Sequence, residues 1–331
     1  MKTIYCFEFE FIYQDFKQKI RGLDMYKHST SEVVMIRPAA FQFNEETAVN
    51  NVYQNNDNAD TNEVQKKALA EFDLLVSKLE EKGVKVNALQ DTSQPSTPDS
   101  IFPNNWFSTH EGGLMVVYPM FAENRQEEIS KFRSQVEEIA EKSQKEEKIF
   151  TIVDYSKNRD RGQYLEGTGS IVIDRKNKVA YSTLSPRASE ELFLEWCQRT
   201  GHEPVSFVSY QEGVPIYHTN IVMGIGEELA LVGLDAIQES DRERVRKKLE
   251  EGGNKIIPLS MDQLKACAGN TLELKGKEGK NFMVISQMAY DSLEKEQISE
   301  IQNHVEMVVV PIPTIEFYGG GSVRCTIAEV F

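Results

Sequence analysis

The sequence predicts an α/β protein built from five repeats of one β-β-α-β unit. Short β-branched runs alternate along the chain with longer segments of helical periodicity. The order of hairpin, helix and strand returns at a spacing of roughly 50 residues, which indicates internal repetition. An unusual polar segment occupies each junction, where the last strand of one unit meets the hairpin of the next.

The first unit is expected to contain a strand at 33–37 (VVMIR), a helix over about 62–82 and a strand at 84–89 (VKVNAL). Apolar residues recur at helical spacing in the central segment. Gly83 follows the helix at the C′ position, where glycine commonly ends a helix. The hairpin of this first unit is incomplete in the sequence pattern.

The other four units repeat the full order, and the second hairpin turns at Gly112 and Gly113. In the second unit the hairpin is expected at 106–119, the helix at 125–145 and the third strand at 148–153. The same three elements are expected at 170–184, 189–199 and 204–210 in the third unit and at 220–234, 240–250 and 255–260 in the fourth. In the fifth unit they are expected at 271–286, 295–304 and 305–313. Five such units could close into a ring of short sheets around a central channel, with the helices outside. An open α/β sheet has the same order of elements, so the pattern alone leaves both architectures open.

The length and composition favour a globular protein with one large domain or two ordinary ones. We expect a single domain at 31–331, preceded by an N-terminal extension, 1–30, of different patterning. With 331 residues and 40% hydrophobic content, the chain can bury a sizeable core. Its net charge of −15 would repel nucleic acid. No apolar run reaches the roughly 18 residues of a membrane span, and no signal-peptide layout begins the chain. We therefore expect a cytoplasmic protein without nucleic-acid or membrane partners.

The junctions between units carry the residues of chemical interest. They contain a carboxylate, an imidazole, a thiol and several carboxamides, and equivalent positions in a ring would face one axis. The segments are FPNNW with Asn105, YLEGTGS with Glu166, YHTN with His218 and Asn220, CAGNTLEL with Asn270, and GGGSVRC with Cys325. Each residue has an ordinary structural explanation by itself, but their shared place in the repeat predicts one catalytic site.

Such a site can perform covalent hydrolysis. A cysteine attacks as the thiolate, which a positive neighbour such as Arg324 would stabilise. Histidine transfers protons near neutral pH, and Glu166 can orient its imidazole. The glycines before Cys325 would let a substrate approach the nucleophile closely. This chemistry requires neither a cofactor nor a metal, and the four widely spaced cysteines show no zinc-binding or disulfide pattern.

The set of motifs GGGSVRC, EGTGS and YHTN resembles the pentein superfamily, the amidinotransferase and arginine deiminase group, from about Val33 to Phe331. This resemblance implies a five-bladed α/β propeller. With FPNNW, the motifs look closest to the citrulline-utilisation hydrolases. The resemblance also implies that Cys325 is the nucleophile, that His218 is the general acid and base, and that Glu166 is the partner of His218 and a contact for the nitrogen end of the substrate.

Two asparagines suggest the substrate. Guanidine-modifying relatives commonly carry aspartates that grip a cation, whereas this chain has Asn105 and Asn220. A carboxamide offers both a donor and an acceptor, which suits a neutral ureido group. We therefore expect hydrolysis of citrulline to ornithine, ammonia and carbon dioxide through S-carbamoyl Cys325. Asn270 and Arg324 are further candidate substrate contacts, and Arg37 is a candidate for the substrate carboxylate.

Two alternatives remain. The chain could act on arginine or a methylarginine, as a deiminase, a hydrolase or an amidinotransferase. It could also be a non-catalytic pentein that serves as a binding ring. Such a protein, however, has no need for a thiol, an imidazole and a carboxylate at equivalent positions of the repeat. In the catalytic interpretation the partner is a small amino-acid substrate, and the sequence leaves a homo-oligomer open.

Overall fold

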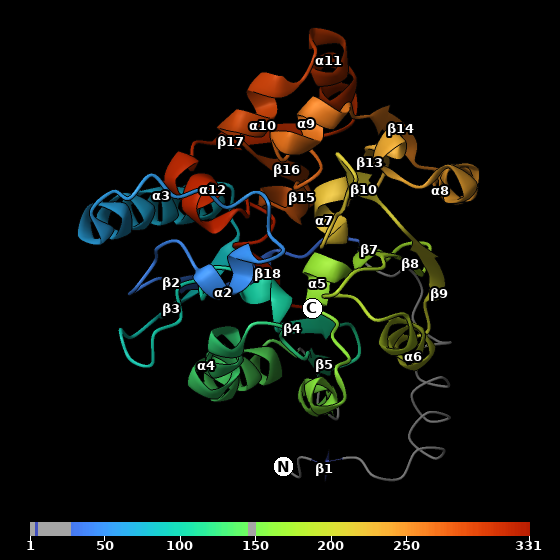
Figure 1. Cartoon of the computed structure of the whole chain (residues 1–331). Coiled ribbons are helices and arrows are strands. Elements are labelled where there is room, and N and C mark those ends of the chain that lie inside the picture. Colours follow the sequence, from blue (N-terminus) through green and yellow to red (C-terminus); the bar gives the residue numbers. More distant parts are fainter. Residues whose placement is uncertain (1–3, 6–27, 145–149) are drawn as a thin grey trace.

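A computed structural model of the chain describes residues 4–5, 28–144 and 150–331. Most of the predicted N-terminal extension, and the start of the strand predicted at 148–153, lie outside these residues. The described part is a mixed α/β fold (Figure 1). Within it, no helix is both long and apolar enough to cross a membrane.

Five small sheets share one strand order. In each sheet a first strand runs antiparallel to a central strand, and the central strand runs parallel to a third. The sheets are β18(Ala328–Glu329)-β2(Glu32–Arg37)-β3(Lys85–Gln90); β4(Phe107–His110)-β5(Leu114–Val117)-β6(Thr151–Asp154), which β1(Ile4–Tyr5) extends; β7(Val172–Asp174)-β8(Val179–Thr183)-β9(Glu203–Phe207); β12(Met223–Ile225)-β13(Leu229–Val232)-β14(Lys255–Pro258); and β15(Leu272–Lys275)-β16(Asn281–Ser286)-β17(Glu306–Val310).

The end of the chain completes the first unit. Strand β18 pairs with β2, with Ala328 opposite Val34 and Glu329 opposite Val33. The hairpin that looked incomplete in the sequence therefore takes its first strand from the C-terminus. This pairing brings the loop that carries Cys325, directly before β18, beside the first unit.

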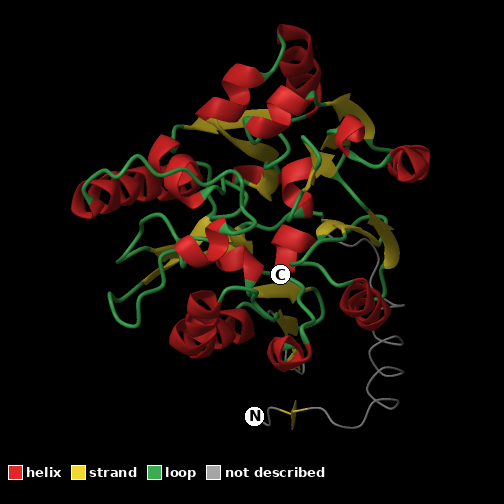
Figure 2. Ribbon diagram, in the orientation of Figure 1, coloured by secondary structure: helices red, strands yellow, loops and turns green. Residues whose placement is uncertain are grey.

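A helix connects the second and third strands of each unit, as a parallel pair requires. These helices are α3 (Thr61–Glu81), α4 (Glu123–Lys142), α6 (Glu190–Thr200), α8 (Glu239–Glu251) and α11 (Lys295–His304). They lie toward the periphery in Figure 1, and Figure 2 shows strands on their inner side. The predicted helix positions are confirmed to within a few residues, and Gly83 ends α3 with a φ of 92°.

The core lies between the sheets and these helices. Strands β5 and β13 are buried along their whole length, whereas α3 buries one face, through Val64, Phe72 and Leu75 among others. One apolar cluster joins the fourth and fifth units, and a second joins the fifth unit to the first. Neighbouring units therefore share their hydrophobic interior, which fixes the junctions relative to one another.

The sequence pattern missed several short elements. A 3-10 turn at Pro103–Asn105 and two four-residue helices, α5 (Gly167–Ser170) and α7 (Thr219–Val222), occupy three of the junctions. Further short elements are α2 (Glu45–Ala48), α9 (Met261–Lys265), α10 (Gln287–Ser292), α12 (Pro313–Gly319) and the hairpin β10(Tyr210–Gln211)-β11(Val214–Pro215). All of these elements are too short to show a period. The 3-10 turn, α5 and α7 nevertheless position residues of the candidate site.

Candidate functional site

Glu166 and His218 occupy the same place in two successive units. Each residue stands directly before a short helix, α5 or α7, and both side chains are buried. His218 Nε2 lies 2.8 Å from Glu166 Oε2. Because an ionised carboxylate can only accept, Nε2 carries the proton and Nδ1 is left as the nitrogen available for proton transfer.

The surroundings of Glu166 favour its ionised form. Its Oε1 accepts the backbone N–H of Phe121 at 2.9 Å, and its Oε2 lies 3.4 Å from the guanidinium of Arg187. Burial raises the pKa of Glu166, but the charge of Arg187 and the hydrogen bond from His218 outweigh burial and lower the pKa to about 2. Glu166 is therefore a carboxylate at neutral pH with its hydrogen-bonding capacity largely occupied.

His218 is neutral at the same pH. Burial lowers the pKa of this imidazole to about 4, although Glu166 acts in the opposite direction, and the nearby charges of Arg187 and Arg125 lower it further. A neutral imidazole with Nδ1 unprotonated is the form that can take a proton from a thiol.

The Cys325 thiol is surrounded by carboxamides. Asn270 Nδ2 lies 3.2 Å and Asn220 Nδ2 lies 3.4 Å from Cys325 Sγ, so both amides can donate to the sulfur. Asn270 is itself held in place, because its Oδ1 accepts the Arg324 backbone N–H and its Nδ2 also reaches the Asn220 carbonyl. Donors aimed at a sulfur stabilise negative charge on it, as a nucleophilic cysteine needs.

The glycines before Cys325 pack closely against the protein's own side chains. A Cβ on Gly319 would lie 2.6 Å from Phe102, and one on Gly321 would lie 2.9 Å from the same ring. Gly320 has a φ of 61°, and a Cβ there would lie 2.7 Å from Gln54. Close packing against the protein's own side chains, together with the left-handed turn at Gly320, thus requires the three glycines.

Asn105 approaches His218 across Gly169. A Cβ on Gly169 would lie 2.5 Å from Asn105 Nδ2 and 2.7 Å from His218 Nδ1, so these two atoms flank the same backbone position. Asn105 Oδ1 accepts from Arg125 Nη1 at 2.6 Å, and Nδ2 donates to Asn104 Oδ1 at 3.0 Å. The junctions of the second, third and fourth units therefore meet.

The predicted site residues form two contacting groups. Glu166, His218 and Asn105 meet around Gly169, and Cys325 meets Asn220 and Asn270. His218 and Asn220 belong to one junction and so connect the groups. No hydrogen bond joins His218 directly to Cys325 in the described part of the chain.

Arg37 stands apart from both groups. It ends β2 as predicted, but its guanidinium pairs in bidentate fashion with Asp73, at 2.8 Å for both contacts, and the side chain is 36% exposed. Gln90 also contacts it. The structure therefore does not place Arg37 at the thiol, because a surface carboxylate already occupies its donors.

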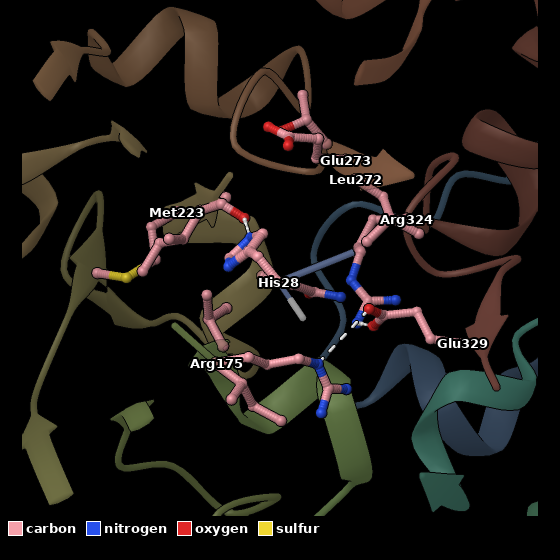
Figure 3. A pocket seen from close by; sticks show the side chains of 13 residues that line it. His28, Arg175, Met223, Leu272, Glu273, Arg324 and Glu329 are labelled. Atoms are coloured by element: carbon pink, nitrogen blue, oxygen red, sulfur yellow. Dashed lines mark hydrogen bonds and ion pairs between the residues drawn. The ribbon is translucent and has the colours of Figure 1, made fainter. Parts of the chain in front are cut away.

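The Arg324 side chain also points elsewhere than expected. It donates to Glu329 Oε2 at 2.9 Å and to the Ile327 carbonyl at 2.9 Å, and only its backbone N–H serves the site. Figure 3 shows Arg324, Glu329 and Arg175 around a cavity of about 30 Å³, which Asn220 also lines. The Arg324 guanidinium is thus occupied by a buried ion pair, which corrects its expected place beside the sulfur.

The sequence pattern missed two buried arginines and gave no role to a polar loop. Arg187 pairs with Glu166, lies over the ring of Tyr217 at 4.5 Å, and donates to the Thr47 carbonyl at 2.9 Å. Arg125 holds Asn105. The segment 44–55 contacts Arg187 through Thr47 and Asn50 and lies against Gly320 through Gln54. No local signal separates these arginines from the surface arginines that are common in such sequences.

Comparisons with known proteins identify the family of the chain. The profile of the family described as "N,N dimethylarginine dimethylhydrolase, eukaryotic" matches residues 37–331. No curated protein sequence matches the chain. The pentein resemblance and the predicted class, a hydrolase of carbon–nitrogen bonds, are confirmed.

Solved structures share the fold. The N-terminal domain of the cyanobacterial arginine dihydrolase ArgZ, bound to substrate, is 15% identical, with a TM-score of 0.70 over 90% of this chain and 97% of that one. Unliganded AgrE is 16% identical, with a TM-score of 0.71 over 91% and 39% of the two chains. A dimethylarginine dimethylaminohydrolase with an S-methyl-L-thiocitrulline adduct is 13% identical, with a TM-score of 0.61 over 91% and 99%. This chain spans only 40% of full-length ArgZ.

Proposed function

The chain belongs to the eukaryotic N,N-dimethylarginine dimethylhydrolase family, and from this premise we propose that it is a cysteine hydrolase of citrulline. The products would be ornithine, ammonia and carbon dioxide, and the intermediate would be S-carbamoyl Cys325. We also propose that the five β-β-α-β units are the blades of an α/β propeller, with the junctions at its axis. The shared strand order of the five sheets supports that arrangement.

One observation carries the choice of substrate. The polar side chains that contact the Cys325 thiol are the carboxamides of Asn220 and Asn270, and neither bears a charge. The carboxylate that contacts His218, Glu166, already accepts from Phe121, Arg187 and His218. A buried guanidinium needs a carboxylate with free acceptor capacity, whereas a ureido group is neutral and needs a mixture of donors and acceptors.

The proposed reaction uses the residues as follows. Neutral His218 takes the thiol proton at Nδ1, and the thiolate adds to the ureido carbon. The bond from that carbon to the ornithine nitrogen then breaks, its electron pair stays on nitrogen, and this nitrogen receives the proton from His218. Water cleaves the remaining S-carbamoyl group, which restores the thiol and releases carbamate, and carbamate decomposes to ammonia and carbon dioxide.

Arginine is the second candidate substrate, because the family is named for a methylated arginine, ArgZ is an arginine dihydrolase and AgrE has been solved with L-arginine. Purified enzyme assayed with citrulline, arginine, dimethylarginine and agmatine separates the two proposals. We expect ornithine release from citrulline. Turnover of arginine without turnover of citrulline would overturn the ureido proposal.

Asn105→Asp is expected to shift the substrate preference. A carboxylate at this position would offer an acceptor where the amide offers a donor, so the ratio of kcat/KM for citrulline to that for arginine should fall by at least about tenfold. Asn55→Asp is a matched control, because Asn55 lies on the exposed surface, where its side chain donates to the Tyr53 carbonyl. An unchanged ratio in Asn105→Asp would argue against contact between Asn105 and the reacting group.

Arg187→Met is expected to move the acid limb of kcat/KM to higher pH. His218 must be neutral to act as the base, so activity should fall as the pH drops through its pKa of about 4. The positive charge of Arg187 lowers that pKa, and its removal therefore raises it. A pH profile of kcat/KM tests this expectation, and a limb that stays in place or moves to lower pH would contradict it.

A further inference from the structure

Arg125 connects α4 to the Asn105 side chain through a buried network. Its guanidinium donates to Asn105 Oδ1 at 2.6 Å and forms a two-contact ion pair with Glu128, at 2.8 and 3.1 Å. It also donates to the Phe102 carbonyl at 2.9 Å. The arginine is 2% exposed and Glu128 is fully buried, so solvent does not compete for these bonds.

This network fixes which way the carboxamide of Asn105 faces. A guanidinium has only donors, so the atom of Asn105 that meets it must be the oxygen. The amide nitrogen consequently turns away from Arg125, toward Gly169 and the ring of His218. One of its two hydrogens is used by Asn104 Oδ1, and the amide has a second one to donate.

We propose that Arg125 is a positioning residue that sets substrate specificity by holding Asn105 as a hydrogen-bond donor toward the reacting group. The proposal rests on the function proposed above. A ureido oxygen accepts a hydrogen bond, whereas a guanidinium offers only donors. If the amide were reversed, its oxygen would face the substrate and would suit a guanidinium. Arg125 thus selects between the two substrate classes through the amide that it orients.

The test compares citrulline and arginine in Arg125→Met. Methionine fills similar space but donates nothing, so the amide of Asn105 is free to turn. We expect the ratio of kcat/KM for citrulline to that for arginine to fall by about tenfold, because one well-placed hydrogen bond contributes about that factor. Both substrates share the same amino-acid portion, so a general loss of binding or of folded protein cancels in this ratio.

Arg133→Met is the matched control, since Arg133 lies in the same helix and pairs with Glu137 and Asp154 near the surface. Its ratio should equal that of the wild type. If Arg125→Met is too unstable to assay, Arg125→Lys replaces it, because lysine keeps the charge beside Glu128 but lacks the planar fork. The ratio should then fall by a smaller factor.

The outcomes separate this proposal from the proposed function. A wild-type enzyme that hydrolyses arginine and not citrulline overturns the proposed function before any variant is made. A wild-type enzyme that prefers citrulline, with an unchanged ratio in the Arg125 variant that folds, overturns the role of Arg125 alone. A reduced ratio in that variant, with Arg133→Met unchanged, supports it.

Discussion

Cys325→Ala is expected to lower turnover by at least about a thousandfold while the protein stays folded, because the variant lacks the only group proposed to form the covalent intermediate. The substitution removes one sulfur that contacts Asn220 and Asn270. Steady-state assays of ornithine release, together with a thermal melt of the same preparation, would measure both properties.

Cys197→Ala is the matched control. Cys197 is also a buried free cysteine, but it packs in an apolar cluster with Phe193 and Trp196, and burial raises the pKa of its thiol. Its loss should reduce stability and leave kcat/KM unchanged. Normal turnover by folded Cys325→Ala would exclude the covalent mechanism.

The same pair of proteins can identify the intermediate. Rapid acid quenching during turnover, followed by peptide mass mapping, should find one carbamoyl group on the peptide that contains Cys325 and none in Cys325→Ala. An amidino group at the same position would indicate attack on a guanidinium and would favour arginine as the substrate. The two groups differ in mass, so the measurement decides between the substrates independently of the kinetics.

The repeated unit was predictable because its elements are long enough to show a period. The helix at α3 carries apolar residues such as Phe72 and Leu75 on one face, and the β-branched runs before and after it read clearly as strands. Counting units then placed Glu166 and His218 at matching positions, and their side chains do meet at 2.8 Å.

Other features depend on contacts between distant parts of the chain, which a local pattern does not contain. The two-residue strand β18 is recognisable only through its pairing with β2, in which Ala328 lies opposite Val34, 294 residues earlier in the chain. Arg125 and Arg187 have no periodic signal, and their burial follows from the carboxylates and carbonyls that surround them. The pairing of Arg37 with Asp73 of α3 is likewise absent from the local pattern.

Gly169→Ala is expected to lower kcat/KM by about a hundredfold, although Gly169 carries no reacting group. The added Cβ would lie 2.5 Å from Asn105 Nδ2 and 2.7 Å from His218 Nδ1, distances that real Cβ atoms do not tolerate. Both side chains are buried and hydrogen-bonded, so one of them must shift. The proposed base and the proposed substrate contact would then lose their relative positions.

Gly233→Ala is the control for a general steric effect. A Cβ at Gly233 would lie 2.4 Å from Leu264, a residue of the apolar core. We expect this variant to melt at a lower temperature with kcat/KM unchanged, whereas Gly169→Ala should lose kcat/KM beyond any loss of folded protein. Equal kcat/KM in both variants would mean that the backbone at Gly169 does not hold Asn105 and His218 in their working positions, and the site would have to tolerate a displaced imidazole.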